Sequence, residues 1–302
     1  MATEGVRVAR AFAPGHVTGV FRPAIRARDP RARGSLGAGI VLELGATAEA
    51  RFAPGKGHRV RILGDRVRPW PISEDVARRL APSEPGAVTV RLRHDLPVGQ
   101  GFGMSAAGAL ATALAVGELA GAPRRRAIDV AHLADLFGGG GLGGVPAILG
   151  GGLEVRVRPG VPPYGRVVRQ AFPGRMLVGV VGRPIPSPKV LRSPKALARI
   201  EAASGVLSKL ARVPAADAFF RASERFTDEA GLLTPAVART VEALRDRGAF
   251  AAQAMFGQSF FALPRTRSAR AECVDWLRKR GVRAVEIGAA ASGGGLLRAG
   301  TS

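Results

Sequence analysis

Alternating apolar and polar positions mark the strands expected in this chain. Val88–Arg93 alternates strictly, which is the period of a half-buried strand. Leu153–Val157 alternates in the same way, so Arg156 and Glu154 share one face of that strand. The other segments for which we predict strands are Val6–Phe12, Ile40–Leu44, Val60–Leu63, Met176–Val181, Phe260–Leu263 and Val282–Ile287.

Helical spacing predicts the elements between these strands. Apolar residues recur every four positions in Ile72–Leu80, and Ala106–Leu119 is rich in Ala and Leu and free of Pro. A third helix is predicted for Arg125–Phe137, where His132 and Asp135 are three positions apart and therefore share a face. Further helices are expected near residues 190–210, 214–230, 235–246 and 268–280.

The order of these elements indicates the class of fold. Strands alternate with helices, which is typical of an α/β sandwich whose strands are joined through helical crossovers. Pro159–Pro163 has the composition of a linker, so we expect two domains, residues 1–164 and 165–302.

Composition restricts the class of protein. The 302 residues are 46% hydrophobic, which suits a globular chain with a substantial core. The sequence lacks an uncharged apolar run of membrane-spanning length and the pattern of a signal peptide. The single cysteine, Cys273, excludes an intramolecular disulfide framework and a zinc site built from several cysteines. We therefore expect a cytoplasmic protein.

The formal net charge of +22 predicts attraction to anions, including nucleotides and acidic metabolites. Nucleic acid is the competing partner. However, the basic residues are scattered, only Arg124–Arg126 form a tight cluster, and aromatic residues make up 5% of the chain. Most of this charge is expected on a solvated surface, with incidental affinity for nucleic acid.

A glycine-rich segment between the expected strand at 88–93 and the helix at 106–119 carries the clearest chemistry. Gly99, Gly101 and Gly103 occupy every second position there, and such a loop lets backbone N–H groups approach an anion beside a helix N-terminus. The pattern differs from a P-loop because residues 57–188 contain no Lys. It also differs from a dinucleotide fingerprint, because Glu118 lies within the helix rather than after the next strand. We predict a phosphate loop at residues 97–107, with the Ser105 hydroxyl placed to hold magnesium.

Two other glycine-rich segments are expected to be loops. Ala13–Gly19 follows the first strand, where a Pro-Gly pair would break the strand and present His16 and Thr18. Gly34–Gly39 precedes another strand and includes Ser35, whose hydroxyl can bind a small ligand. Taken alone, each segment is better explained as a hairpin turn.

The pattern Pro-x-Gly-x-Gly-x-Gly-x-Ser-Ala-Ala at residues 97–107 resembles the second motif of the galactokinase, homoserine kinase, mevalonate kinase and phosphomevalonate kinase (GHMP) group. This resemblance implies that ATP is the phosphoryl donor. The ATP-binding residues that it implies are Pro97, Gly99, Gly101, Phe102, Gly103, Met104, Ser105, Ala106 and Ala107.

Within that group the chain is similar to the archaeal pantoate kinases. The segments that carry the similarity are Ala13–Gly19, Asp29–Gly39, Gly141–Val145, Arg183–Ser187 and Met255–Ser259. The resemblance implies ATP-dependent phosphorylation of the 4-hydroxyl of pantoate on the way to coenzyme A. It also implies an α+β GHMP kinase fold, with an N-terminal domain like ribosomal protein S5 domain 2 and a ferredoxin-like C-terminal domain. Relatives often form homodimers.

The same resemblance assigns roles to individual residues. Ser105 matches a serine that binds magnesium and phosphate, and Asp135 matches an acidic position, usually Glu, that is a second magnesium ligand. Ser105, Asp135 and His132 are the expected catalytic residues. The expected acceptor-binding residues are His16, Ser35, His132, Arg156 and Ser187.

One departure concerns the proton of the acceptor hydroxyl. The relatives typically read Gly-Thr-Gly-Leu-Gly-Asp-Val where this chain has Gly140 in place of the Thr and Gly144 in place of the Asp. General-base catalysis is worth about 10²–10⁴-fold, although phosphoryl transfer depends mainly on positioning and charge neutralisation. Three alternatives stay open: catalysis without a base, as attributed to homoserine kinases; a substitute such as His132 or Asp135; or a non-catalytic relative that binds nucleotide or nucleic acid. Homoserine, shikimate and mevalonate are the alternative acceptors.

Overall fold

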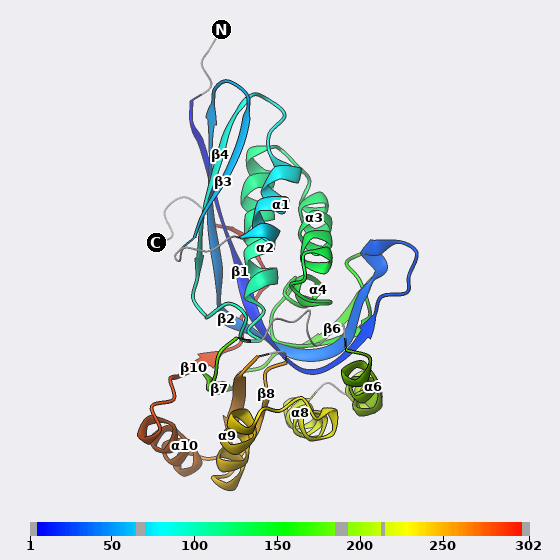
Figure 1. The fold of residues 1–302 in the computed structure, drawn as a ribbon, viewed down its shortest axis with the longest axis vertical. Helices are drawn as coiled ribbons and strands as arrows, with labels where there is room; N and C mark the ends of the chain where they lie inside the picture. The colour runs from blue at the N-terminus through cyan, green and yellow to red at the C-terminus, as the bar shows by residue number, and fades with distance from the viewer. Residues whose placement is uncertain (1–4, 65–69, 185–192, 213–214, 256, 298–302) are drawn as a thin grey trace.

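The computed structural model describes residues 5–64, 70–184, 193–212, 215–255 and 257–297. Its strands form two sheets, and helices pack on both (Figure 1). The strands are β1 (Arg7–Ala24), β2 (Gly34–Pro54), β3 (His58–Gly64), β4 (Gly86–His94), β5 (Leu153–Arg158), β6 (Arg166–Gln170), β7 (Arg175–Val180), β8 (Ala249–Gln253), β9 (Ser259–Pro264), β10 (Ala284–Gly288) and β11 (Gly295–Leu297). The helices are α1 (Pro71–Leu80), α2 (Met104–Leu119), α3 (Arg124–Phe137), α4 (Gly144–Ala147), α6 (Pro194–Ala203), α7 (Leu207–Leu210), α8 (Ala216–Ala230), α9 (Pro235–Asp246) and α10 (Arg267–Lys279), with 3₁₀ turns η1 (Pro30–Ala32) and η2 (Ser204–Val206).

The first sheet is seven-stranded and mostly antiparallel. Its main path is β11-β1-β2-β4-β3, and β5 pairs with both β2 and β6. Among the described strands only β3 and β4 pair in parallel. The α/β sandwich expected from the alternation of strands and helices is therefore wrong, because neighbouring strands in the described sheets pair mostly antiparallel. The α+β class is confirmed.

The two segments expected to be loops are part of the long strands β1 and β2. Their ladder extends from the pair Arg7 and Phe52 to the pair Ala24 and Gly34, and it includes both Ala13–Gly19 and Gly34–Gly39. The register shifts between Pro14 and His16 and again between Thr18 and Val20. A β-bulge places an extra residue in one strand without ending the pairing, so the Pro-Gly pair bends β1 instead of breaking it. The loop prediction for both segments is wrong.

Three helices cover one face of the first sheet (Figure 1). α1, α2 and α3 begin one or two residues before the predicted helices and end where predicted, so these predictions are confirmed. α2 is apolar around its circumference and is buried between the sheet and α3, as expected for such a helix. Within the described ranges, no helix combines the length and apolar character needed to cross a membrane.

The second sheet is four-stranded and antiparallel, in the order β10-β7-β9-β8. Helices α6–α9 separate β7 from β8, and α10 separates β9 from β10, so the chain follows the β-α-β-β-α-β path of a ferredoxin-like unit. β8 escaped prediction because all five of its residues are buried and its pattern does not alternate. β6 still belongs to the first sheet and β11 returns to it, so the sheets do not separate at residue 165. The division at 164/165 stays a prediction.

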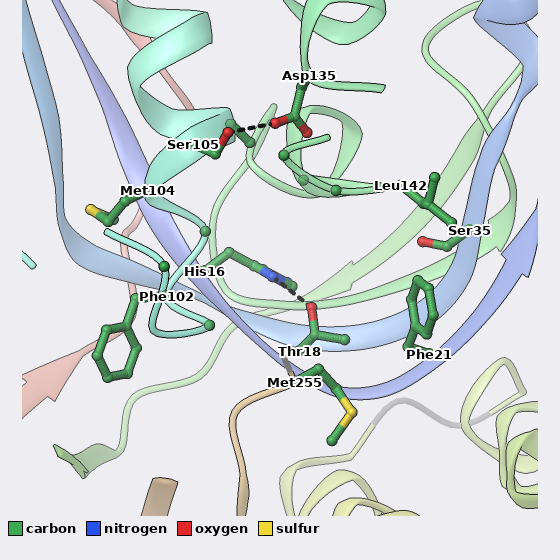
Figure 2. Close-up of a pocket in the computed structure, with 18 of the residues that line it drawn as sticks. His16, Thr18, Phe21, Ser35, Phe102, Met104, Ser105, Asp135, Leu142 and Met255 are labelled. Atoms are coloured by element: carbon green, nitrogen blue, oxygen red, sulfur yellow. Dashed lines mark hydrogen bonds between the residues drawn. The ribbon is translucent and has the colours of Figure 1, made fainter. Parts of the chain in front are cut away.

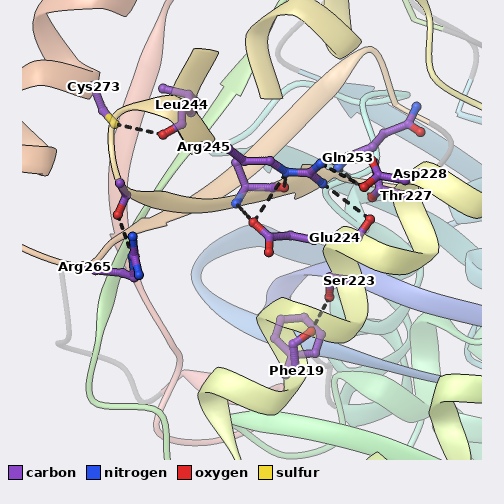
Figure 3. Close-up of polar contacts among 12 residues, drawn as sticks. Phe219, Ser223, Glu224, Thr227, Asp228, Leu244, Arg245, Gln253, Arg265 and Cys273 are labelled. Carbon is purple, nitrogen blue, oxygen red and sulfur yellow. Dashed lines mark hydrogen bonds and ion pairs between the residues drawn. The ribbon is translucent and has the colours of Figure 1, made fainter. Parts of the chain in front are cut away.

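Arg245 in α9 ties the helices of the second unit to β8 (Figure 3). Its Nη1 donates to both carboxylate oxygens of Asp228 in α8 at 3.0 and 2.9 Å, and its Nε donates to the carbonyl of Ala251 at 2.9 Å. Past the end of β8, the N–H of Met255 donates to the carbonyl of Thr18 at 3.2 Å. This contact brings the turn after β8 against β1, where the two sheets meet.

Candidate active site

The predicted phosphate loop joins β4 to α2. Gly99, Gly101 and Gly103 have φ angles of 79°, 78° and 68°, a left-handed conformation that glycine adopts without steric cost. Gly103 directly precedes α2, whose first N–H groups lack partners within the helix. The predicted order of strand, glycine loop and helix is confirmed, and loops of this geometry are suited to binding anions.

Contacts from both sheets hold this loop in place. The N–H of His16 in β1 donates to the carbonyl of Phe102 at 3.0 Å. The buried Gln100 side chain donates to the carbonyl of Gly182 at 2.8 Å and accepts from the N–H of Gln258 at 3.1 Å. Nothing in the sequence pattern had distinguished Gln100 from the other loop residues. Its role is to fix the loop between the two units.

A cavity open to solvent lies beside the loop, and about 730 Å³ of empty space, including solvent at its mouth, separates its walls (Figure 2). It is lined by residues 99 and 101–106, the glycine segment 140–144, and the side chains of Asp135, His16, Thr18, Phe21, Ser35, Arg156 and Met255. The structure thus brings together nearly all of the phosphate loop and four other predicted site residues, His16, Ser35, Asp135 and Arg156. Pro97 and Ala107 flank the cavity without lining it. Ser187 lies outside the described residues.

Ser105 and Asp135 face each other at one end of the cavity, where the Ser105 hydroxyl donates to Asp135 Oδ1 at 2.9 Å (Figure 2). Burial raises the pKa of Asp135 to about 7, although the hydrogen bond from Ser105 opposes this shift. No group of three or more acidic, His or Cys side chains forms a metal cluster within the described ranges. Two hard oxygens are nevertheless enough for Mg²⁺, which usually binds one or two protein groups together with substrate phosphates. The buried Asp135 carboxylate has no cationic partner among the described residues, so a Mg²⁺ ion bound here would neutralise its charge.

Two glycines close the cavity beside this pair. A Cβ atom on Gly140 would overlap both Asp135 Oδ1 and Ser105 Oγ. A Cβ atom on Gly144 would lie 2.5 Å from Ala106 Cβ in α2 and 3.5 Å from Asp135 Oδ2. Because the backbone at residue 144 packs so closely on α2, the chain has no room there for a carboxylate side chain.

A buried polar group lies across the cavity from that pair. Glu154 and Arg156, on one face of β5, form an ion pair, and Glu154 Oε1 lies 2.9 Å from Nε2 of His16. Burial opposes ionisation of Glu154, but Arg156 and the hydrogen bond from His16 outweigh it and hold the Glu154 pKa below its usual range. Burial lowers the pKa of His16 despite the neighbouring carboxylate. At neutral pH the group therefore contains a carboxylate, a guanidinium and a neutral imidazole.

Several buried polar atoms here have no hydrogen-bond partner among the described residues. They include Ser35 Oγ, Arg156 Nε and Glu154 Oε2. Ser35 Oγ and Arg156 Nε both lie close to the Cα of Gly143, so they converge on one part of the cavity. Leaving a buried polar group unsatisfied costs about 1–3 kcal/mol, and this arrangement indicates a ligand that supplies the missing partners.

His132 lies outside the cavity. It is buried in α3, its Nε2 is 3.1 Å from the carbonyl oxygen of Arg33, and it does not line the cavity. Burial lowers the pKa of His132 below its usual range. In this structure its imidazole holds the chain entering β2 against α3, and its expected contact with the acceptor stays a prediction.

Sequence reasoning did not single out several residues of this site. Phe21, Leu142 and Met255 line the cavity with apolar atoms, and Glu154 organises its polar side. The one available signal was the alternation in β5, which places Glu154 on the same face as Arg156. The contact between Glu154 and His16 joins residues 138 positions apart, so no local pattern could have revealed it.

Comparisons with known proteins agree with this geometry. Residues 72–152, which contain the phosphate loop, Asp135 and the glycine segment, match the family model of the GHMP kinases N terminal domain. The chain is 34% identical to a pantoate kinase of Thermococcus kodakarensis, over 86% of this chain and 89% of that protein. It is 32% identical to a pantoate kinase of Methanospirillum hungatei, over 84% and 86%. A solved structure described as a phosphotransferase related to the CoA biosynthesis pathway superposes with a TM-score of 0.87 at 29% identity, covering 98% of this chain and all of that one. The chain belongs to the pantoate kinase family of the GHMP kinases.

Proposed function

We propose that this chain transfers the γ-phosphoryl group of ATP to the 4-hydroxyl of pantoate. The observation that carries the proposal is the pairing of two features in one cavity. A left-handed glycine loop at a helix N-terminus lies on one side. On the other side lie atoms of Ser35 and Arg156 that have no hydrogen-bond partner in the part of the chain that the structure describes. The first suits a triphosphate, and the second suits a small acid that also carries hydroxyl groups.

The nucleotide side is formed by the loop and the Ser105–Asp135 pair. Backbone N–H groups of residues 99–106 would donate hydrogen bonds to the phosphate oxygens, because the left-handed glycines let the backbone approach the phosphates closely. Ser105 Oγ and Asp135 would hold Mg²⁺, which supplies neutralisation of charge on the transferring phosphoryl group.

The acceptor side is formed by Arg156 and Ser35. A guanidinium binds a carboxylate through a planar fork, and one edge of the Arg156 fork, the Nη1, is already held by Glu154. The unpartnered Nε is left for the pantoate carboxylate, and Ser35 Oγ is left for a hydroxyl or the same carboxylate. This arrangement orients the acceptor hydroxyl toward the phosphate loop across the cavity.

Release of ADP with pantoate as acceptor tests the proposal. Purified protein with ATP and Mg²⁺ should release ADP when pantoate is added, and Ser105→Ala should lower kcat by about 100-fold or more, as expected when one charge-stabilising group is lost. Homoserine, shikimate and mevalonate form the comparison panel. Turnover of one of these acceptors without turnover of pantoate would contradict the substrate while leaving the kinase activity in place.

Ser35→Ala should separate binding from folding. Because Ser35 Oγ is buried and makes no hydrogen bond among the described residues, its removal should raise the free energy of unfolding by about 1 kcal/mol. In the same variant the KM for pantoate should rise about tenfold, the equivalent of one lost hydrogen bond. Ser223→Ala is the matched control, since the buried Ser223 hydroxyl donates to the carbonyl of Phe219 at 2.7 Å. That variant should lose stability and keep its KM, and an unchanged KM in Ser35→Ala would contradict the assigned contact.

A further inference from the structure

We propose that His16 accepts the proton of the acceptor hydroxyl, and that Glu154 is a positioning residue that fixes the imidazole for this step. The inference deepens the proposed function and rests on it. It addresses the proton that relatives are expected to pass to a carboxylate at the position of Gly144.

The backbone of β1 aims His16 into the cavity. Register shifts in the β1–β2 ladder lie on either side of the His16–Thr18 segment, and bulges re-aim side chains at the edges of active sites. The N–H of His16 is bonded to Phe102 of the phosphate loop, so this residue is anchored directly to the nucleotide side. Figure 2 shows its imidazole inside the cavity, pointing toward Thr18.

The hydrogen bonds around His16 define its tautomer. The Glu154 carboxylate can only accept, so the Nε2 atom that lies 2.9 Å from it carries the proton. Nδ1 is then an acceptor, and it lies 3.2 Å from Thr18 Oγ1, whose hydroxyl donates to it. The result is a chain of carboxylate, imidazole and hydroxyl whose last member lines the cavity.

The charges around the imidazole suit a base that gains a proton only transiently. The groups that face it are Glu154 and Arg156 of β5 and Arg169 of β6. Burial and the two arginines keep the ring neutral in the resting protein, and Glu154 stabilises the imidazolium once a proton arrives. Arg156 keeps Glu154 ionised, so the carboxylate is already charged when it stabilises the imidazolium.

The other candidates in the described part of the chain are less suited. Gly144 has no carboxylate and packs against Ala106. His132 is bonded to the carbonyl of Arg33 outside the cavity. Asp135 accepts the Ser105 hydroxyl and would be committed to Mg²⁺. His16 is the neutral imidazole that lines the cavity.

Phosphoryl transfer exchanges one phosphorus–oxygen bond for another and releases one proton. The acceptor oxygen forms a bond to the γ-phosphorus of ATP while the bond from that phosphorus to the bridging oxygen of ADP breaks. The hydroxyl proton passes to Nδ1 of His16, either directly or through Thr18, which accepts it while giving its own proton to Nδ1. The imidazolium then returns the proton to solvent after the products leave.

His16→Gln is the decisive variant, since glutamine can replace hydrogen bonds but cannot act as a base at neutral pH. Its kcat should fall by about 10²–10⁴-fold, the usual contribution of a general base. The dissociation constant for ATP and the Tm should be unchanged. With Mg²⁺ at saturating concentration, so that Asp135 would stay ionised, kcat of the wild type should decline at acidic pH, and this decline should be absent in His16→Gln. His58→Gln, on the exposed strand β3, is the matched control and should behave as wild type.

Glu154→Gln and Thr18→Val separate positioning from proton transfer. Glu154→Gln should move the acidic limb of the kcat profile to lower pH and reduce kcat less than His16→Gln does, because the imidazole remains but loses its carboxylate. Thr18→Val should reduce kcat only if the hydroxyl relays the proton, and Thr18→Ser should then restore it. A Tm measured for each variant identifies any that fails to fold.

Three outcomes would overturn the assignment. A His16→Gln kcat within tenfold of wild type would show transfer without this base, and a retained acidic limb would point to Asp135. A change confined to the KM for the acceptor would make His16 a binding residue. All variants are assayed on whichever hydroxy acid the wild type phosphorylates, so failure with pantoate overturns the substrate alone, and inactivity on the whole panel overturns both proposals.

Discussion

Asp135→Asn is expected to make the protein more stable at pH 8 while removing most of its activity. The Asp135 carboxyl is buried, its one side-chain hydrogen bond within the described ranges comes from Ser105, and its pKa is raised to about 7. An ionised carboxylate in that position is costly unless a cation accompanies it. Asparagine keeps the shape and an acceptor for the Ser105 hydroxyl but carries no charge.

The sign of the pH dependence follows from the direction of that shift. Near pH 3 the carboxyl is protonated in both the folded and the unfolded protein. Between about pH 4 and 7 the unfolded chain releases the proton first, so the contribution of Asp135 to stability falls as pH rises, by about 4 kcal/mol in all. The asparagine variant lacks this loss. Its Tm should therefore exceed that of wild type at pH 8 and approach it near pH 4, both measured in EDTA.

Asp29→Asn is the opposite-sign control. Hydrogen bonds from Arg31, at 3.1 and 2.7 Å, hold the pKa of Asp29 below its usual range, so this substitution should lower the Tm at pH 8.

The activity of Asp135→Asn should fall as well. Its kcat should drop by about 100-fold or more, because Mg²⁺ would lose its charged protein ligand. Mg²⁺ with a non-hydrolysable ATP analogue should raise the Tm of wild type but not of the variant. Equal Tm values for wild type and variant at pH 8 would contradict the buried, uncompensated carboxylate.

The phosphate loop and its flanking elements could be predicted because their signals are local. Alternation defined β4, an Ala-rich stretch defined α2, and the glycines between them required the left-handed backbone that is observed. The helix carrying Asp135 was predicted for similar reasons, and its end at Phe137 directs the chain back over Ser105. The ferredoxin-like unit was correctly expected, but from the resemblance to pantoate kinases rather than from the pattern of apolar and polar residues.

The acceptor side could not be predicted because it depends on pairing between distant segments. Pro14 and the glycines of β2 have low strand propensity, yet a ladder formed by two long neighbouring strands overrides those local preferences. Only that ladder and the pairing of β2 with β5 bring His16 to Glu154 and Ser35 toward Arg156. The helical spacing of His132 and Asp135 also suggested that His132 belongs to the site. In the structure, His132 instead contacts the carbonyl of Arg33, just before β2.

Gly140→Ala is expected to separate the two groups that would hold the metal. A methyl group at residue 140 would overlap Asp135 Oδ1 and Ser105 Oγ, and moving the buried Asp135 or the half-buried Ser105 side chain away would break their hydrogen bond. The glycine is required here for close approach, since its φ is not in the left-handed region. Overpacking of this kind costs about 1–3 kcal/mol, and kcat should fall by about 100-fold as the pair is displaced.

Gly141→Ala provides a control one residue away. A Cβ atom there would lie 3.7 Å from Asp135 Oδ2, an ordinary contact, and nothing else lies within 4 Å. This variant should keep its kcat within about threefold of wild type, since a methyl group there makes only one ordinary contact with the cavity wall and should change stability by no more than about 0.5 kcal/mol. The measurements are kcat with pantoate and the Mg²⁺ concentration that gives half-maximal rate, which should rise in Gly140→Ala alone. Equal losses in both variants would indicate that the glycine segment must be flexible as a whole, and would argue against a specific need for space around Ser105 and Asp135.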